Sequence, residues 1–214
     1  MRVRRNFERP EGKKSARLVV IAAEGKETEN IYFETMKRLR QASNVHVEIL
    51  HRNDHSSSPI VVYDQIQQFK KEYNIDDDDQ LWVVVDRDKW TAKMLKSVAQ
   101  YCYHDPHLNF CVSNPCFELW LILHVEDIST LSEEERIKMK ANRKSSKRGA
   151  TFLKQRLRDH LGSYHESNYD AERLISTVEV AIDRADKLDT NKQDRWPQSL
   201  STRVYLLARS IMNP

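Results

Sequence analysis

Two aspartates, Asp86 and Asp88, follow a run of strand-forming apolar residues in the segment QLWVVVDRDKW, which spans residues 80–90. Residues i and i+2 of an extended chain face the same side, so these two carboxylates can converge. A third carboxylate, Glu24, follows another apolar run, LVVIAA, at residues 18–23. If the two runs are neighbouring strands of one sheet, all three carboxylates lie at the edge where open α/β sheets bind their ligands.

Carboxylates gathered at one edge repel one another, and their pKa values shift unless a positive charge balances them. A hard divalent cation supplies that charge, because Mg²⁺ binds a few carboxylates together with waters and phosphate oxygens. The pattern therefore predicts that Glu24, Asp86 and Asp88 bind Mg²⁺ or Mn²⁺. Taken singly, an aspartate at a strand end is more often a helix cap or a turn residue, and D-x-D is a common pattern. The combination of Glu-Gly after one strand with D-x-D after another makes the prediction more specific.

Apolar runs of strand length alternate with segments of helical spacing through roughly the first 127 residues. Strands are predicted at residues 17–23, 45–50, 81–85 and 108–114. One of the helices between them is expected to begin at Ser58-Pro59 and to run to about Glu72, since serine is a common N-cap and proline a common first residue. Strands that alternate with helices in this way predict an α/β fold with a mostly parallel sheet.

After Ile128 the strand patterns end, and helices are predicted near residues 131–141, 150–161, 170–187 and 201–212. We therefore expect three parts. They are a basic, flexible arm over residues 1–15, an α/β domain over 16–127 and a mainly helical region over 128–214.

The composition excludes several classes of protein. Of the 214 residues 39% are apolar and 31% charged, and no apolar run approaches the roughly 18 residues of a membrane span. The basic N-terminus lacks the apolar segment of a secretory signal. The three cysteines form no C-x-x-C pair, which argues against a disulfide framework or a cysteine zinc site. These features predict a globular protein of the reducing cytoplasm.

Positive charge is concentrated in one tract. Residues 136–158 contain ten Lys or Arg and no Asp or Glu. Such a tract can neutralise the phosphates of a nucleic acid, and the candidate contact residues are Arg143, Lys144, Lys147 and Arg148. Lys26, after the first strand, is a further candidate for a phosphate contact. The alternative for the tract is a solvated helix face with a flexible linker, and for Lys26 a solvated lysine at a helix start.

Glu118 lies among apolar residues in the segment PCFELWLILH, where a free carboxylate is costly unless it is paired or bound to metal. It is either an additional acid of the site or a first-turn glutamate favoured by the helix macrodipole. Asn114 is expected to cap this helix, with Pro115 as its first residue.

Four segments resemble the RloB-like family of the TOPRIM superfamily. They are EGKETENIYF, VVVDRDKW, SNPCFELWLILH and LSTRVYLLARSI, and they occur in the family's order from about residue 16 to the C-terminus. The resemblance implies a TOPRIM-like sheet and phosphodiester hydrolysis, with the metal held by Glu24, Asp86 and Asp88. Because its motif includes Glu118, that residue is counted with the catalytic set. The resemblance also implies an ATPase partner in bacterial phage-defence or restriction-linked loci.

The sequence thus favours a metal-dependent nuclease acting on DNA or RNA. The alternative is a partner-regulated, nucleic-acid-binding subunit of an ATPase complex without activity of its own. Glu24 could act as a general acid or base instead of a ligand. The choice between DNA and RNA (tRNA included), the number of metals and the oligomeric state stay open at this point.

Overall fold

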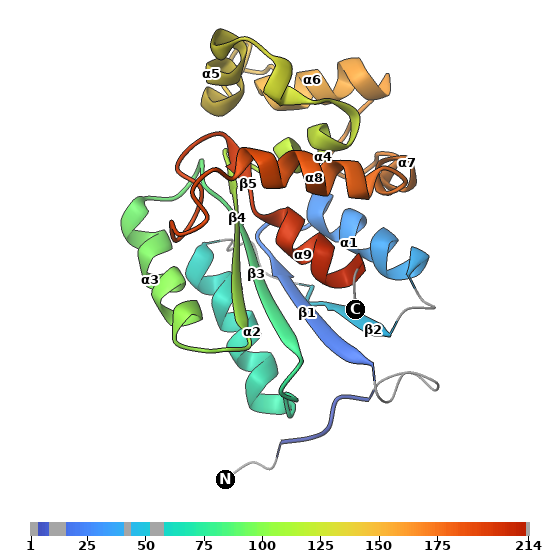
Figure 1. The fold of residues 1–214 in the computed structure, drawn as a ribbon, viewed down its shortest axis with the longest axis vertical. Coiled ribbons are helices and arrows are strands. Elements are labelled where there is room, and N and C mark those ends of the chain that lie inside the picture. The colour runs from blue at the N-terminus through green and yellow to red at the C-terminus, as the bar shows by residue number, and fades with distance from the viewer. Residues whose placement is uncertain (1–3, 9–15, 41–43, 52–57, 213–214) are drawn as a thin grey trace. The chain divides into compact units, whose positions relative to one another are not determined.

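The computed structural model describes residues 4–8, 16–40, 44–51 and 58–212. They form an α/β fold with a five-stranded sheet in the order β2-β1-β3-β4-β5 (Figure 1). The strands are β1 (Arg17–Ala23), β2 (Val45–Ile49), β3 (Gln80–Asp86), β4 (Leu108–Asn114) and β5 (Ser201–Thr202). β1 pairs in parallel with β2 and with β3, whereas β4 and β5 are antiparallel. The predicted fold class, α/β with a mostly parallel sheet, is confirmed.

The chain divides into two compact units. The first unit contains Met1–Val84, Trp90–Phe110 and Ser210–Pro214, and the second unit contains Val85–Lys89 and Cys111–Arg209. The boundary predicted near residue 127 falls inside the second unit. The prediction that the chain divides into independently folding domains near residue 127 stays a prediction.

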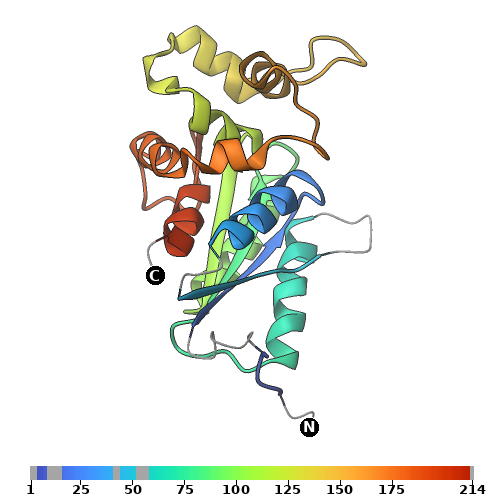
Figure 2. The ribbon, with the colours of Figure 1, turned by 90° about the vertical axis from the view of Figure 1, so that its right-hand side faces the viewer.

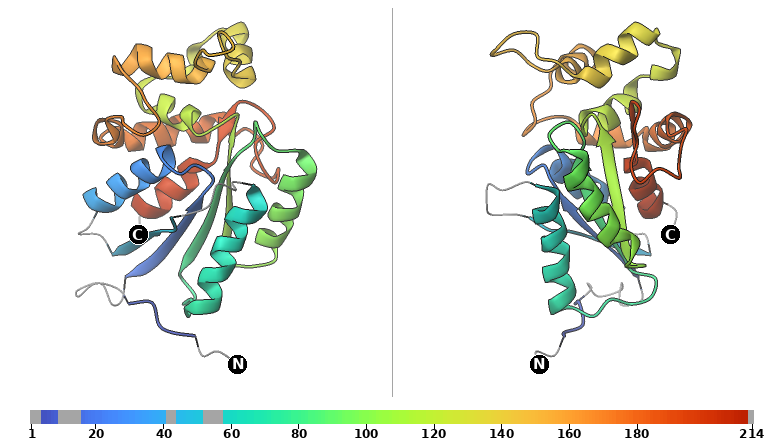
Figure 3. Two further views of the ribbon diagram at one scale, coloured as in Figure 1. Left: turned by 180° about the vertical axis from the view of Figure 1, so that it is seen from behind. Right: turned by 90° about the vertical axis from the view of Figure 1, so that its left-hand side faces the viewer.

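Helices cover the strands of the first unit because these strands are apolar on both faces. β1 is buried along nearly its whole length, as expected of a parallel strand covered on both sides. The helices are α1 (Thr28–Leu39), α2 (Pro59–Glu72) and α3 (Ala92–Tyr103). α1 contacts β2, and α2 contacts both β1 and α3. Figure 2 shows α1 beside β1 and β2, and Figure 3 shows α2 and α3 side by side.

The helix starts of the first unit follow the predicted signals closely. α2 begins at Pro59 directly after Ser58 and ends at Glu72, as predicted, although the Ser58 side chain makes no capping hydrogen bond. α3 begins after Thr91, whose hydroxyl accepts the Met94 N–H at 3.4 Å.

Part of the predicted N-terminal arm contacts α2. Within residues 4–8, the Arg5 N–H donates to the carbonyl of Glu72 at 2.9 Å. The ring of Phe7 packs against three aromatic rings, those of His46, Phe69 and Tyr73. The rest of the predicted arm lies outside the described residues.

α4 (Glu118–Val125) lies at the centre of the second unit. Its sequence, ELWLILHV, is apolar on all sides apart from Glu118 and His124, and every residue but Val125 is buried. A helix that is apolar all round requires partners on every side. α4 finds them in α6 (Phe152–Leu161), α7 (Ala171–Ile175) and α8 (Val178–Leu188).

The helices predicted after Ile128 are present with changed ends. α5 (Glu133–Ala141) and α6 lie within the predicted ranges, and a short 3₁₀ helix, η1 (Ile128–Thr130), precedes them. The single helix predicted over residues 170–187 is wrong, because the chain forms α7 and α8 there. At the junction, the Thr177 hydroxyl lies 2.9 Å from the Leu174 carbonyl and 3.1 Å from that of His124.

The last helix, α9 (Val204–Met212), begins later than predicted, because Ser201 and Thr202 form β5. In the same motif, the Arg203 guanidinium is buried and donates from Nε to Oδ2 of Asp189 at 3.0 Å. Its other nitrogens donate to three carbonyls of the loop after α8, those of Asn191, Lys192 and Asp194. The arginine of LSTRVYLLARSI thus holds that loop against β5.

His124 makes the stability of the second unit dependent on pH. Its side chain is buried, packs edge-on against Trp120 at 5.0 Å between ring centroids, and lies 3.4 Å from the Thr177 hydroxyl. Burial lowers the pKa of His124 to about 3, a backbone hydrogen bond with Leu174 partly opposes this shift, and the positive charge of Arg184 adds to it. The unfolded chain takes up a proton at its ordinary pKa of about 6.5, whereas the folded chain does not.

We therefore expect the free energy of unfolding to fall as the pH decreases from about 6.5 toward 3, by up to ~1.4 kcal/mol per pH unit from this group. Urea denaturation between pH 7.5 and 5 measures the slope. His124→Gln removes the titrating group, so its stability should change less with pH than that of the wild type. Equal slopes in the two proteins would contradict the assignment.

Candidate functional site

The backbone that carries Asp86 and Asp88 is fixed by the end of β4. The Arg87 N–H donates to the carbonyls of Ser113 at 2.8 Å and Pro115 at 3.0 Å, and the Asp88 N–H donates to the Pro115 carbonyl at 3.1 Å. Asp86 is the last residue of β3 and is buried, whereas Asp88 is exposed. The D-x-D segment is therefore held in place by its backbone, with one buried and one accessible carboxylate.

Pro115 does not begin the next helix, so this part of the sequence prediction is wrong. The Asn114–Pro115 peptide is cis, and α4 begins three residues later, at Glu118. The Asn114 side chain does not cap α4 but donates to the carbonyl of Pro197 at 3.0 Å. The Pro115 carbonyl is already used by the D-x-D segment, so residues 115–117 form a turn that supports Asp88 instead of a helical turn.

Glu118 joins the two aspartates near one thiol. Burial raises the pKa of Cys116 well above its usual value, and the negative charges of Glu118, Asp86 and Asp88 raise it further. All of these residues belong to the second unit. Three of the four acids singled out in the sequence thus raise the pKa of the same thiol.

The buried charge of Glu118 has partners from α6 and from the segment after it. Lys154 Nζ lies 3.7 Å from Glu118 Oε1, and the Tyr164 hydroxyl lies 3.5 Å from the same oxygen. Lys154 also forms an ion pair with Glu166. Glu118 is therefore both a first-turn residue of α4 and a paired carboxylate. The sequence had left open whether it is a first-turn glutamate or an additional acid of the site.

Glu24 directly follows β1 in the first unit, and its side chain is buried. Its N–H donates to the Val84 carbonyl at 2.9 Å, and its Oε2 accepts the indole N–H of Trp90 at 2.7 Å. The Glu29 carboxylate lies close to the glycine after Glu24, since a Cβ on Gly25 would lie 1.8 Å from Oε2 of Glu29. Oε1 of Glu29 accepts the Gly25 N–H at 3.1 Å. The Glu-Gly pair thus allows the start of α1 to pack against the end of β1.

The acids of the D-x-D segment suit a hard cation in ligand type. Over the described residues, no three His, Cys, Asp or Glu side chains are grouped so as to hold an ion by themselves. Mg²⁺ does not need such a cage, because it is usually bound by one or two carboxylates plus waters and phosphate oxygens. Asp86 and Asp88 are two residues apart and one of them is exposed, which fits that kind of partial site.

The comparison with known families agrees with these motifs. A family model described as RloB-like protein matches residues 19–211. The chain belongs to the RloB-like family. This match confirms the family predicted from the four segments, all of which lie within or overlap the matched range. No curated protein and no solved structure matched the chain.

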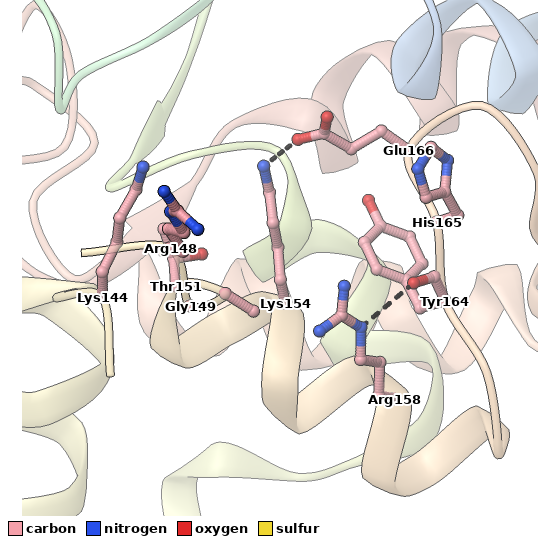
Figure 4. Close-up of a pocket in the computed structure, with 10 residues that line it drawn as sticks. Lys144, Arg148, Gly149, Thr151, Lys154, Arg158, Tyr164, His165 and Glu166 are labelled. Atoms are coloured by element: carbon pink, nitrogen blue, oxygen red, sulfur yellow. Dashed lines mark hydrogen bonds and ion pairs between the residues drawn. The ribbon is translucent and has the colours of Figure 1, made fainter. Parts of the chain in front are cut away.

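In this RloB-like chain, two of the five predicted basic residues line a pocket and three do not. Lys144 and Arg148 line a cavity of about 260 Å³ together with Lys154 and Arg158 (Figure 4), and we call this cavity the basic pocket. Arg143 and Lys147 are exposed residues of the same segment outside its lining, and Lys26 follows β1 in the first unit. Only part of the predicted nucleic-acid contact set therefore shares a pocket.

Across the described ranges of this family member, no helix is both long enough and apolar enough to cross a membrane.

Three residues that matter to the site escaped the sequence analysis as individual candidates. Trp90 was quoted only as the end of the segment QLWVVVDRDKW, yet its indole N–H donates to Oε2 of Glu24. Lys154 was not separated from the other Lys and Arg residues of the basic tract. Asn142 was read only as part of a linker, although an asparagine just after a helix is a known signal for a left-handed C-terminal residue.

Asn142 connects three segments of the second unit. It ends α5 in the left-handed conformation, with φ 43°. Its Oδ1 accepts the Leu153 N–H at 3.0 Å, in the first turn of α6. Its Nδ2 donates to Sγ of Cys116 at 3.3 Å. One side chain thus fixes the start of α6 relative to the turn beside Asp86, Asp88 and Glu118.

We expect Asn142→Ala to lower the free energy of unfolding by about 1–3 kcal/mol, from the lost helix cap and the left-handed backbone. Urea denaturation measures the change. Arg143→Ala, the exposed neighbour, is the matched control and should stay within about 0.5 kcal/mol of the wild type. If both variants are as stable as the wild type, the side chain of Asn142 does not connect these segments.

Proposed function

We propose that this RloB-like protein is a nuclease that hydrolyses phosphodiester bonds with the help of Mg²⁺ or Mn²⁺. The main support is one arrangement within the second unit. The Asp88 N–H bonds to the Pro115 carbonyl, Glu118 follows three residues later, and Glu118 is paired with Lys154 of the basic pocket. Acidic groups suited to a cation thus lie beside cationic groups suited to phosphate, which is the combination that phosphodiester hydrolysis requires.

In this proposal Asp86 and Asp88 hold the cation. When bound, it would supply a more acidic water and positive charge beside the phosphate that is cleaved. Asp86 contributes a buried carboxylate directly before Arg87, whose N–H is bonded to the carbonyls of Ser113 and Pro115. Asp88 contributes an exposed carboxylate that water and substrate can reach.

Glu24 is the third acid of the proposal. It follows β1, which pairs in parallel with β3, and the indole of Trp90 holds one of its oxygens. Its role is either that of a further ligand or that of a general acid or base. Glu118 is the additional acid, and its contacts with Lys154 and Tyr164 orient its carboxylate.

The wider setting of the proposal follows from family membership. We propose that the protein belongs to the TOPRIM superfamily, works with an ATPase partner in bacterial antiviral defence and is cytoplasmic. The described cysteines, Cys102, Cys111 and Cys116, are buried free thiols, which is in keeping with a reducing compartment. The substrate is nucleic acid, either DNA or RNA.

The test of the proposed activity replaces each aspartate with its neutral isostere. Asp86→Asn and Asp88→Asn should each lower metal-dependent cleavage by at least about 100-fold, because both remove a charge that binds the cation. Cleavage of labelled single-stranded DNA, duplex DNA and structured RNA is measured with Mg²⁺, with Mn²⁺ and with EDTA. Asp77→Asn, an exposed aspartate in the turn before β3, is the matched control and should retain full activity.

Each assay is run with and without the proposed ATPase partner, so that activity restrained or released by a partner is detected. Full metal-dependent cleavage by both Asn variants would show that the metal site lies elsewhere. If the wild type cleaves none of the substrates in either setting, the chain is not a nuclease, and the binding subunit becomes the better interpretation.

A further inference from the structure

The basic pocket is built by a hairpin and the helix that follows it. Lys144 pairs with Thr151 in an antiparallel bridge, and the Ser145 N–H donates to the Ala150 carbonyl at 3.2 Å. The turn is tight at Gly149, where a Cβ would lie 2.9 Å from the backbone nitrogen of Ser146. The segment predicted as a possible linker is thus a hydrogen-bonded hairpin that leads directly into α6.

Positive charge dominates the pocket. Lys144 and Arg148 come from the hairpin, and Lys154 and Arg158 come from successive turns of α6. Figure 4 shows the charged ends of Lys144, Arg148 and Lys154 directed to the same side. Among the lining residues, Glu166 is the single carboxylate, and it is paired with Lys154. Four cations against one carboxylate leave an excess of positive charge for an anion.

Two further features of the lining suit an oxygen-rich ligand. The buried Thr151 hydroxyl has no hydrogen-bond partner within the described part of the chain. Thr151 also precedes the first turn of α6, and the N-terminus of a helix favours negative charge. The cavity of about 260 Å³ is large enough for a phosphate with part of its hydration shell, since a water occupies roughly 30 Å³.

The pocket lies next to Glu118 within the same unit. Lys154 and Tyr164 line the pocket, and both contact Oε1 of Glu118. Glu118 lies three residues after Pro115, whose carbonyl accepts the Asp88 N–H at 3.1 Å. A group bound by Lys154 is therefore connected through Glu118 and the turn at residues 115–117 to the segment that carries the proposed metal ligands.

We infer that the basic pocket binds a phosphate group of the substrate nucleic acid and thereby positions the strand beside Glu118. This inference rests on the proposed nuclease function and gives it a specific anchoring site. Lys154 is the central contact, Arg158 and the hairpin cations surround it, and Glu166 occupies Lys154 until the phosphate replaces it. The tract thus contains one defined site, which distinguishes Lys154 from exposed lysines such as Lys147.

The experiment measures binding of a fluorescein-labelled oligothymidylate in EDTA, so that no cleavage is needed. Lys154→Ala should weaken binding roughly tenfold, as expected for the loss of a charge-assisted hydrogen bond, and reduce the slope of log K against log salt by about one. Lys138→Ala, an exposed lysine of α5 in the same tract, is the matched control and should change the affinity less than about twofold. Equal effects of the two substitutions would show diffuse attraction without a site.

A second variant guards against misfolding, because Lys154→Ala also leaves Glu118 without its cation. Glu166→Gln frees Lys154 and should tighten binding several-fold. Glu179→Gln, an exposed glutamate of α8, changes the net charge equally and should not have this effect. If Glu166→Gln binds no better than Glu179→Gln, the pocket is not the binding site.

Competition identifies the source of the phosphate. The same oligonucleotide is compared with and without a 5′-phosphate, and inorganic pyrophosphate is added as a competitor. Binding that depends on Lys154 supports the inference whether the pocket holds the 5′-phosphate or a phosphate of the backbone. The inference would be overturned if the protein bound pyrophosphate but did not bind the oligonucleotide. If the pocket does not bind the oligonucleotide but cleavage is retained, only this inference is rejected. If the pocket binds the oligonucleotide but no cleavage occurs, the proposed nuclease function is rejected.

Discussion

A negative charge at the start of an apolar helix organises the second unit. Glu118 is the first residue of α4, which is buried on all sides, and a buried carboxylate without compensation is costly. Lys154 supplies the compensating charge from α6, and Tyr164 adds a hydroxyl. Because the ion pair requires α6 to lie against α4, it also fixes the hairpin that precedes α6. Glu118 and the basic pocket are therefore neighbours for a single electrostatic reason.

The strands and the positions of the acids could be predicted because both depend on local patterns. The apolar runs gave β1 and β3, and the two-residue spacing of Asp86 and Asp88 placed both after the same strand. β5 was missed because two residues contain no periodicity. The turn at Pro115 was misjudged because its carbonyl bonds to Arg87 and Asp88, and no local pattern encodes that contact.

The contacts that assemble the site join residues far apart in sequence, which explains why they were not predicted. Lys154 and Glu118 are separated by 36 positions, and the hydrogen bond from Asn142 to Cys116 spans 26. Charge composition could mark the tract over residues 136–158 as basic but could not rank its members. Ranking requires the fold, since Lys154 lies against a buried acid whereas Lys147 is exposed.

The two carboxylates that share Lys154 are not equivalent, and their difference suggests how an anion enters. Glu118 has a side chain 9% exposed, whereas that of Glu166 is 47% exposed. An exposed ion pair contributes little to stability because water solvates the separated charges, so Glu166 can leave Lys154 at small cost. Removing the cation from a buried carboxylate is far more costly, so Lys154 should keep Glu118 while it exchanges Glu166 for a phosphate. The buried pair then keeps the lysine in place, and the exposed pair leaves it available to substrate.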